Sequence, residues 1–85
     1  MDERRVYGNY IVGQGKDFTV KQVKSNFGYE NQLIADEWYV VHVTGKVIGC
    51  YAYTNADMAH ALAMGLEQRD LKLVAEEMEK VLRGE

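Results

Sequence analysis

The clearest pattern in the chain is a pair of apolar runs, Trp38–Val43 and Val47–Tyr53, separated by Thr44, Gly45 and Lys46. Short runs rich in valine, isoleucine and aromatic residues on either side of a glycine predict a β-hairpin, because glycine can take the positive φ that a tight turn needs. A two-residue loop that starts at Thr44 or at Gly45 assigns the side chains to the same faces, so the face assignment holds in both registers.

Both faces of this predicted hairpin are apolar. One, the aliphatic face, carries Tyr39, Val41, Val43, Ile48, Cys50 and Ala52. The other, the aromatic face, carries Trp38, Val40, His42, Val47, Gly49, Tyr51 and Tyr53. A hairpin with one face in water would alternate apolar and polar residues. The pattern therefore predicts that each face of this hairpin meets another surface.

Two further strands are predicted before the hairpin. Arg5–Val12 is rich in residues that favour strands, and Phe18–Val23 alternates in the way of a half-exposed strand. The intervening Gly13–Asp17 is a turn signal, and Lys24–Gln32 has no period and is predicted to be a loop. Together with the hairpin, these segments predict a four-stranded antiparallel sheet.

Helical spacing follows the last strand. A first apolar stripe comprises Met58, Ala61, Leu62, Gly65 and Leu66. A second stripe, out of phase with the first, comprises Leu71, Val74, Ala75, Met78, Val81 and Leu82. The phase changes near Asp70, which predicts two helices or one bent helix. The fold class is therefore α+β, a four-stranded antiparallel sheet followed by one bent or two C-terminal helices (β-β-β-β-α-α) in a single domain of residues 1–85.

Composition narrows the class of protein. A chain of 85 residues that is 47% hydrophobic is typical of one globular domain. Its apolar runs are too short to span a bilayer, and its N-terminus has no apolar stretch of the kind found in secretory signals. Two histidines and a single cysteine predict neither an internal disulfide nor a metal-ligand cluster. We expect a cytoplasmic protein with no membrane contact, no metal and no cofactor.

The net charge of −3 comes entirely from residues 47–85, because residues 1–46 are balanced. An acidic helix repels phosphate backbones, which disfavours a nucleic-acid partner. The same helix could meet a basic protein surface, although a charged face that simply keeps the chain in solution is the simpler interpretation.

No arrangement of residues predicts catalysis. Cys50 and His42 lie on opposite faces of the predicted hairpin, so they cannot form a nucleophile and its base. Gly8 and Gly13 have the spacing of a phosphate-binding loop, but Gln14 stands where that motif has lysine. We therefore expect a protein that is not an enzyme.

The aromatic face is the strongest functional candidate. Trp38, Tyr51 and Tyr53 could together present on the order of 500 Å² of apolar surface, about the largest patch that a monomer leaves exposed. Three covers stay open: the chain's own helix around Met58–Leu66 or the loop Lys24–Gln32, a second copy in a two-fold dimer, or a different partner. The aliphatic face is expected to pack under the Leu71–Leu82 stripe, which would bury Cys50.

The sequence favours a small non-enzymatic regulator or inhibitor. We expect it to bind a protein partner through a sheet face, the acidic helix or both, with a homodimer as the expected assembly. A phage or mobile-element protein that blocks a host enzyme is one concrete form. The residues predicted to bind are Trp38, His42, Val47, Tyr51 and Tyr53. The alternative is a single-stranded nucleic-acid-binding module whose aromatic rings stack on bases, which the net charge disfavours.

Overall fold

The computed structural model describes residues 4–19 and 33–84, which form one sheet and one long helix. The strands are β1 (Arg5–Tyr7), β2 (Tyr10–Gln14), β3 (Trp38–His42) and β4 (Val47–Tyr51), and the helix is α1 (Ala56–Leu82). Short 3-10 turns at Gly15–Asp17 and Tyr53–Asn55 follow β2 and precede α1. The strands lie in the order β1-β2-β3-β4 with every neighbouring pair antiparallel, which confirms the α+β class and the four-stranded sheet.

The four strands are not the four that the sequence pattern predicts. The segment predicted as one strand, Arg5–Val12, is a hairpin, because the chain turns at Gly8 and Asn9 and pairs Tyr7 with Tyr10. Gly8 has a φ of 59°, and glycine at the first central position is what a type II′ turn requires. In the predicted strand Phe18–Val23, Phe18 and Thr19 belong to no strand, and the rest lies outside the described residues, as does the predicted loop Lys24–Gln32.

A β-bulge in β4 changes which residues share a face. Val40 pairs with Gly49, but Val41 pairs with Val47, so Ile48 is the extra residue on β4. One inserted residue moves every side chain on one side of it to the opposite face. The bulge therefore places Val47 on the face of Val41, although the sequence pattern predicted it on the aromatic face with Trp38.

The first half of α1 covers the aromatic face of the sheet. Its buried residues Ala59 and Ala63 pack against a cluster of strand residues, which comprises Tyr10, Val12 and Val40. Half-buried side chains complete this core: Tyr7, Trp38, Tyr51, Leu62 and Leu66. Gly49 allows the close approach, because a Cβ at that position would lie 2.8 Å from Cδ2 of Leu62. Of the three covers considered for this face, the structure has the chain's own helix.

The opposite face of the sheet has a smaller core of its own. Tyr39 and Val41 are buried there against the partly buried Phe18, Leu33 and Val47. The expectation that the Leu71–Leu82 stripe covers this face is wrong, because every residue of that stripe is exposed. Phe18 and Leu33 cover only the part of the aliphatic face around Tyr39 and Val41. The other residues of that face are exposed: Val43, Ile48, Cys50 and Ala52.

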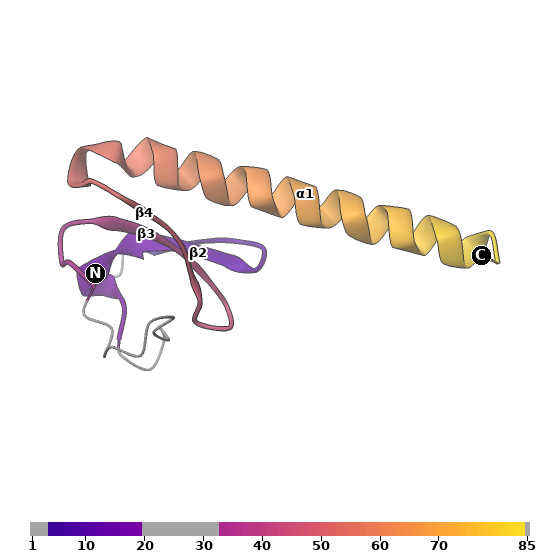
Figure 1. The fold of residues 1–85 in the computed structure, drawn as a ribbon, viewed down its shortest axis with the longest axis horizontal. Helices are drawn as coiled ribbons and strands as arrows, with labels where there is room; N and C mark the ends of the chain where they lie inside the picture. Colours follow the sequence, from indigo (N-terminus) through magenta and orange to yellow (C-terminus); the bar gives the residue numbers. More distant parts are fainter. Residues whose placement is uncertain (1–3, 20–32, 85) are drawn as a thin grey trace.

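The helix is single and continuous, so the predicted pair of helices is wrong. It spans 27 residues, which at about 1.5 Å per residue makes it roughly 40 Å long. Asp70 lies at the change of phase, within the continuous helix, and its carboxylate accepts a hydrogen bond from Tyr10 in β2. Figure 1 shows α1 lying across the sheet and then continuing well past it to the C-terminus. The change of phase near Asp70 therefore marks the end of contact with the sheet, not the end of the helix.

The helix–sheet contact depends on small side chains, so a larger side chain there should destabilise the fold. Ala63→Leu should lower the free energy of unfolding by about 1–3 kcal/mol, because added methylene groups in a filled core force backbone shifts and strained rotamers. Ala61→Leu is the matched control, since Ala61 lies in the same helix but is exposed. Urea titrations followed by circular dichroism measure both. Equal unfolding midpoints for the two variants would contradict the observed packing.

Candidate functional site

The five residues predicted to bind do not form one exposed patch. Trp38 and Tyr51 lie directly opposite each other on β3 and β4, and both pack under the first half of α1. The ring of His60, which α1 contributes, has its centroid 5.7 Å from that of Trp38. The rings of Trp38 and Tyr51 are half-buried, so they serve mainly to hold the helix on the sheet.

The other three predicted residues lie in different surroundings. His42 is half-buried at the end of β3, where its Nδ1 lies 2.9 Å from Oγ1 of Thr44. Val47 packs on the far face of the sheet with Val41. Tyr53 lies beyond β4 in a 3-10 turn and is 64% exposed, next to an open polar recess. The open aromatic surface predicted from the sequence is therefore absent from the described residues.

Two polar contacts anchor α1 to the sheet beside this apolar core. The hydroxyl of Tyr7 lies 2.9 Å from Nδ1 of His60, and the hydroxyl of Tyr10 donates a hydrogen bond of 2.7 Å to Oδ2 of Asp70. The hydrogen bond from Tyr10 lowers the pKa of Asp70, with a smaller contribution from Arg69. In the same way, the hydrogen bond to Asp70 raises the pKa of Tyr10. Asp70 is thus the last residue of α1 with a described side-chain bond to the sheet.

Cys50 is exposed, contrary to the expectation that it is buried, and it carries a polar contact of its own. Its thiol donates a hydrogen bond of 3.1 Å to Oε2 of Glu37. Local burial of the thiol raises the pKa of Cys50, and the bond to Glu37 raises it further. Because the thiolate is the reactive form, this environment makes Cys50 a weak nucleophile.

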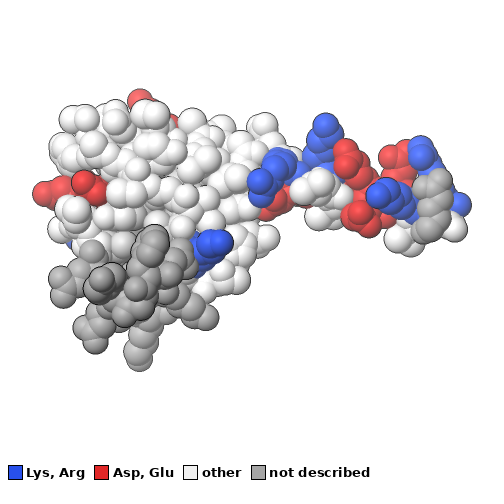
Figure 2. Space-filling view, in the orientation of Figure 1, with Lys and Arg blue, Asp and Glu red and all other residues white. Residues whose placement is uncertain are grey.

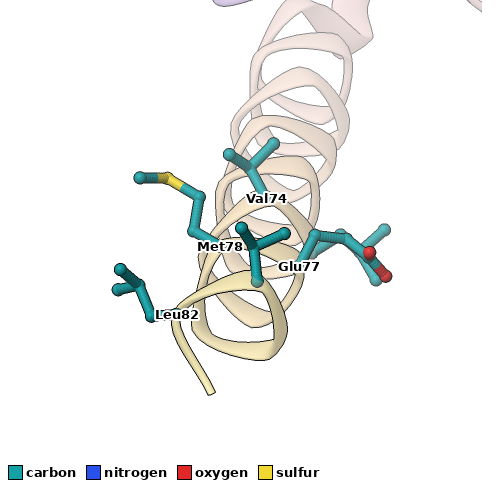
Figure 3. Close-up of a pocket in the computed structure, with 6 residues that line it drawn as sticks. Val74, Glu77, Met78 and Leu82 are labelled. Carbon is teal, nitrogen blue, oxygen red and sulfur yellow. The ribbon is translucent and has the colours of Figure 1, made fainter. Parts of the chain in front are cut away.

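A run of exposed apolar side chains lies on the distal half of α1, residues Leu71–Leu82. We call it the distal apolar face, and it comprises Leu71, Val74, Met78, Val81 and Leu82. Met78 is 61% exposed and Leu82 is 85% exposed, although both are large apolar side chains. Figure 3 shows Met78 and Leu82 pointing to the same side of the helix and Glu77 pointing to the other. A shallow groove of about 430 Å³ lies along this part of the helix, and its lining comprises Leu73, Val74, Glu77, Met78, Val81 and Leu82.

Charged residues occupy the rest of the distal half. Figure 2 shows lysine, arginine and acidic side chains gathered along the projecting helix, while most of the visible sheet body is uncharged. Nζ of Lys80 lies 3.7 Å from Oε1 of Glu77, and Arg83 pairs with Glu79 one turn away. Ion pairs at these spacings support a helix in water, so the distal half is amphipathic in its own right.

Sequence reasoning recognised this stripe but assigned it to the core of the same chain. The signal that could have found it is the phase change near Asp70 taken together with the length of the helix. A sheet of five-residue strands spans only about 17 Å along each strand, so it cannot cover both halves of a helix of roughly 40 Å.

Other types of site find less support in residues 4–19 and 33–84. Within these ranges, no three His, Cys, Asp or Glu side chains lie close enough together to bind a metal ion. None of the described helical sequence is apolar enough over a sufficient length to traverse a bilayer. Comparison with protein families, curated proteins and solved structures finds no match to the chain.

The bond between Tyr10 and Asp70 generates a prediction on pH. Because the pKa of folded Asp70 lies below its ordinary value of about 3.9, the bond stabilises the fold above that pH and loses its effect as pH falls through the lowered value. Tyr10→Phe removes the donor. Urea midpoints of the two proteins should differ at pH 7 and converge as the pH falls below the ordinary aspartate pKa of about 3.9. A difference that stays constant across this range would contradict the assignment.

The contact between Cys50 and Glu37 predicts how fast the thiol reacts. At pH 8, Cys50 should react with iodoacetamide several-fold more slowly than the same chain unfolded in urea, because its raised pKa leaves little thiolate. Glu37→Gln removes the nearby negative charge and should speed the reaction of the folded protein. Mass spectrometry of the alkylated chain follows both rates, and equal rates for the two folded proteins would refute the role of Glu37.

Proposed function

We propose that this chain is a non-enzymatic interaction protein that binds another protein through the distal apolar face of α1. The single observation that carries the proposal is the exposure of this face on a helix that extends past its own sheet. The sheet and the first half of α1 then act as a folded base, and the distal half acts as the binding element. Action of this kind suits a regulator or inhibitor in the cytoplasm.

The size of the exposed face supports this role. Burying a leucine, valine or methionine removes about 60–120 Å² from water, so the five side chains of the face present roughly 300–600 Å². Monomeric proteins rarely leave a larger contiguous apolar patch exposed, and a patch of this size is often functional. An amphipathic helix that buries such a stripe against another chain is a recurrent mode of protein recognition.

The weak support for the distal half within its own chain also favours a protein partner. Isolated helices shorter than about 12–15 residues are marginal in water, since packing of an apolar face supplies most helix stability in proteins. Only the start of the distal half, at Leu71 and Val74, shares a recess with the β1–β2 turn at Gly8 and Asn9. The described side-chain contacts beyond Val74 are surface ion pairs. Such pairs contribute about 0.2–0.5 kcal/mol each. A partner that covers the apolar face would supply the missing packing.

The sheet offers less support for the alternative function. A single-stranded nucleic-acid-binding module would need aromatic rings free to stack on bases. Trp38 and Tyr51 pack against α1, and only Tyr53 of the three rings is largely exposed. The helix therefore carries the proposed interaction in place of the aromatic face.

A photo-crosslinking residue at position 78 tests the proposal in the source cell. Benzoylphenylalanine in place of Met78 should give covalent protein adducts on illumination, because this position lies at the centre of the proposed contact. The same residue in place of Glu76 is the matched control, since Glu76 lies on the charged side of the same helix. Adducts from position 78 well above those from position 76 support the proposal. Equal or absent adducts at position 78 would rule out this surface as the binding site.

A further inference from the structure

We infer that the occupant of the distal apolar face is a second copy of this chain, whose α1 packs against the first in the opposite direction. The inference rests on the proposed function, because it names the partner of the same surface. Three features of the distal half support it: the spacing of its apolar residues, the pattern of side chains that flank them, and the area that pairing would bury.

The apolar residues of the distal half have the spacing of a helix–helix seam. Leu71, Ala75, Met78 and Leu82 follow one another at intervals of four, three and four residues. This alternation keeps side chains on the line where two helices meet with knobs packed into holes. The seam requires no rearrangement of the chain, because all four residues are already exposed along one continuous helix.

The two flanks of this seam differ from each other. One flank carries Val74 and Val81, and the other carries Lys72 and Glu79. In a two-fold pair of antiparallel helices, each flank meets the same flank of the other copy. The apolar flank would therefore meet itself. On the charged flank, Lys72 would face Glu79 of the second copy, and Glu79 would face the second Lys72. The charged flank is thus complementary to itself only when the helices are antiparallel.

A parallel pair lacks this match. Parallel helices place one flank against the other flank of the partner, so Glu79 would face Val74 of the second copy. That arrangement brings a carboxylate against apolar surface, which costs free energy without a compensating bond. The antiparallel arrangement also places the two sheets at opposite ends of the helical contact, since the sheet of each chain lies on the proximal half of α1.

The area available is consistent with a modest dimer. The exposed apolar side chains of both copies would bury roughly 600–1,200 Å², at about 60–120 Å² for each side chain. Polar atoms along the flanks add to this figure. Stable specific interfaces begin at about 1,200 Å² in total. The estimated area lies at or below this bound, so the pairing belongs to the weak, transient class of interfaces, and we expect a dissociation constant on the order of micromolar.

Sedimentation equilibrium of the full chain tests the occupant directly. At about 200 micromolar, which is well above the expected dissociation constant, the wild-type protein should show twice the mass of one chain. Met78→Lys should be monomeric with an unchanged circular dichroism spectrum of the sheet. Glu76→Gln, on the charged side of the helix, is the control and should dimerise like the wild type.

Charge exchange then tests the direction of pairing. Lys72→Glu should raise the dissociation constant about tenfold, because two attractive pairs become repulsive. The double variant Lys72→Glu and Glu79→Lys should recover most of the wild-type affinity. In a Cys50→Ser background, chains with Leu71→Cys should form disulfides mainly with chains that carry Leu82→Cys, since antiparallel helices bring these two positions together.

The outcomes separate this inference from the proposed function. A wild-type chain that stays monomeric, or a double variant that stays as weak as Lys72→Glu, overturns the antiparallel dimer. If a monomeric chain still gives adducts with another protein from position 78, the proposed function stands and the partner is that protein. If neither dimer nor adduct forms, both proposals fail.

Discussion

The packing of Ala59 and Ala63 on Val12 and Val40 sets how the helix lies on the sheet, and the rest of the structure depends on this contact. Two small side chains, each fully buried, bring the helix close to the strands, and Gly49 gives Leu62 room on β4. This contact fixes the N-terminal half of α1 on the sheet. A sharp kink in a helix needs a cause such as proline, and the chain has no proline. The contact with the sheet therefore also sets the direction of the distal half of this 27-residue helix.

The helix is longer than the sheet that it contacts, and this difference divides the helix into two parts. The sheet supports α1 as far as Asp70, where the bond from Tyr10 gives the last described side-chain attachment. Beyond this point, the apolar residues face water. The proximal half thus belongs to the core of the fold, and the distal half is free to provide a core for an assembly. One continuous element links the stability of the base to the geometry of the proposed interface.

The chemistry of the sheet is consistent with a structural role. Its rings and polar groups are used within the chain: Trp38 contacts the ring of His60, Tyr10 bonds to Asp70, and Cys50 bonds to Glu37. Each contact joins residues that lie far apart in the sequence, and each lies beside a packed cluster. These groups of the sheet therefore already have partners within the chain. The apolar side chains of the helix beyond Asp70 are exposed to water instead.

The sequence by itself determined the α+β class, the β3–β4 hairpin and the two helical stripes, because these depend on local periodicity and on glycine in turns. It could not determine which surface each stripe covers. The inserted Ile48 moved Val47 to the other face, the turn at Gly8 made two strands from one, and the helix ran past the sheet that the pattern expected it to cover. Periodicity records that a face is apolar. Only the tertiary structure decides what lies against it, because that depends on lengths and directions of elements that are distant in the chain.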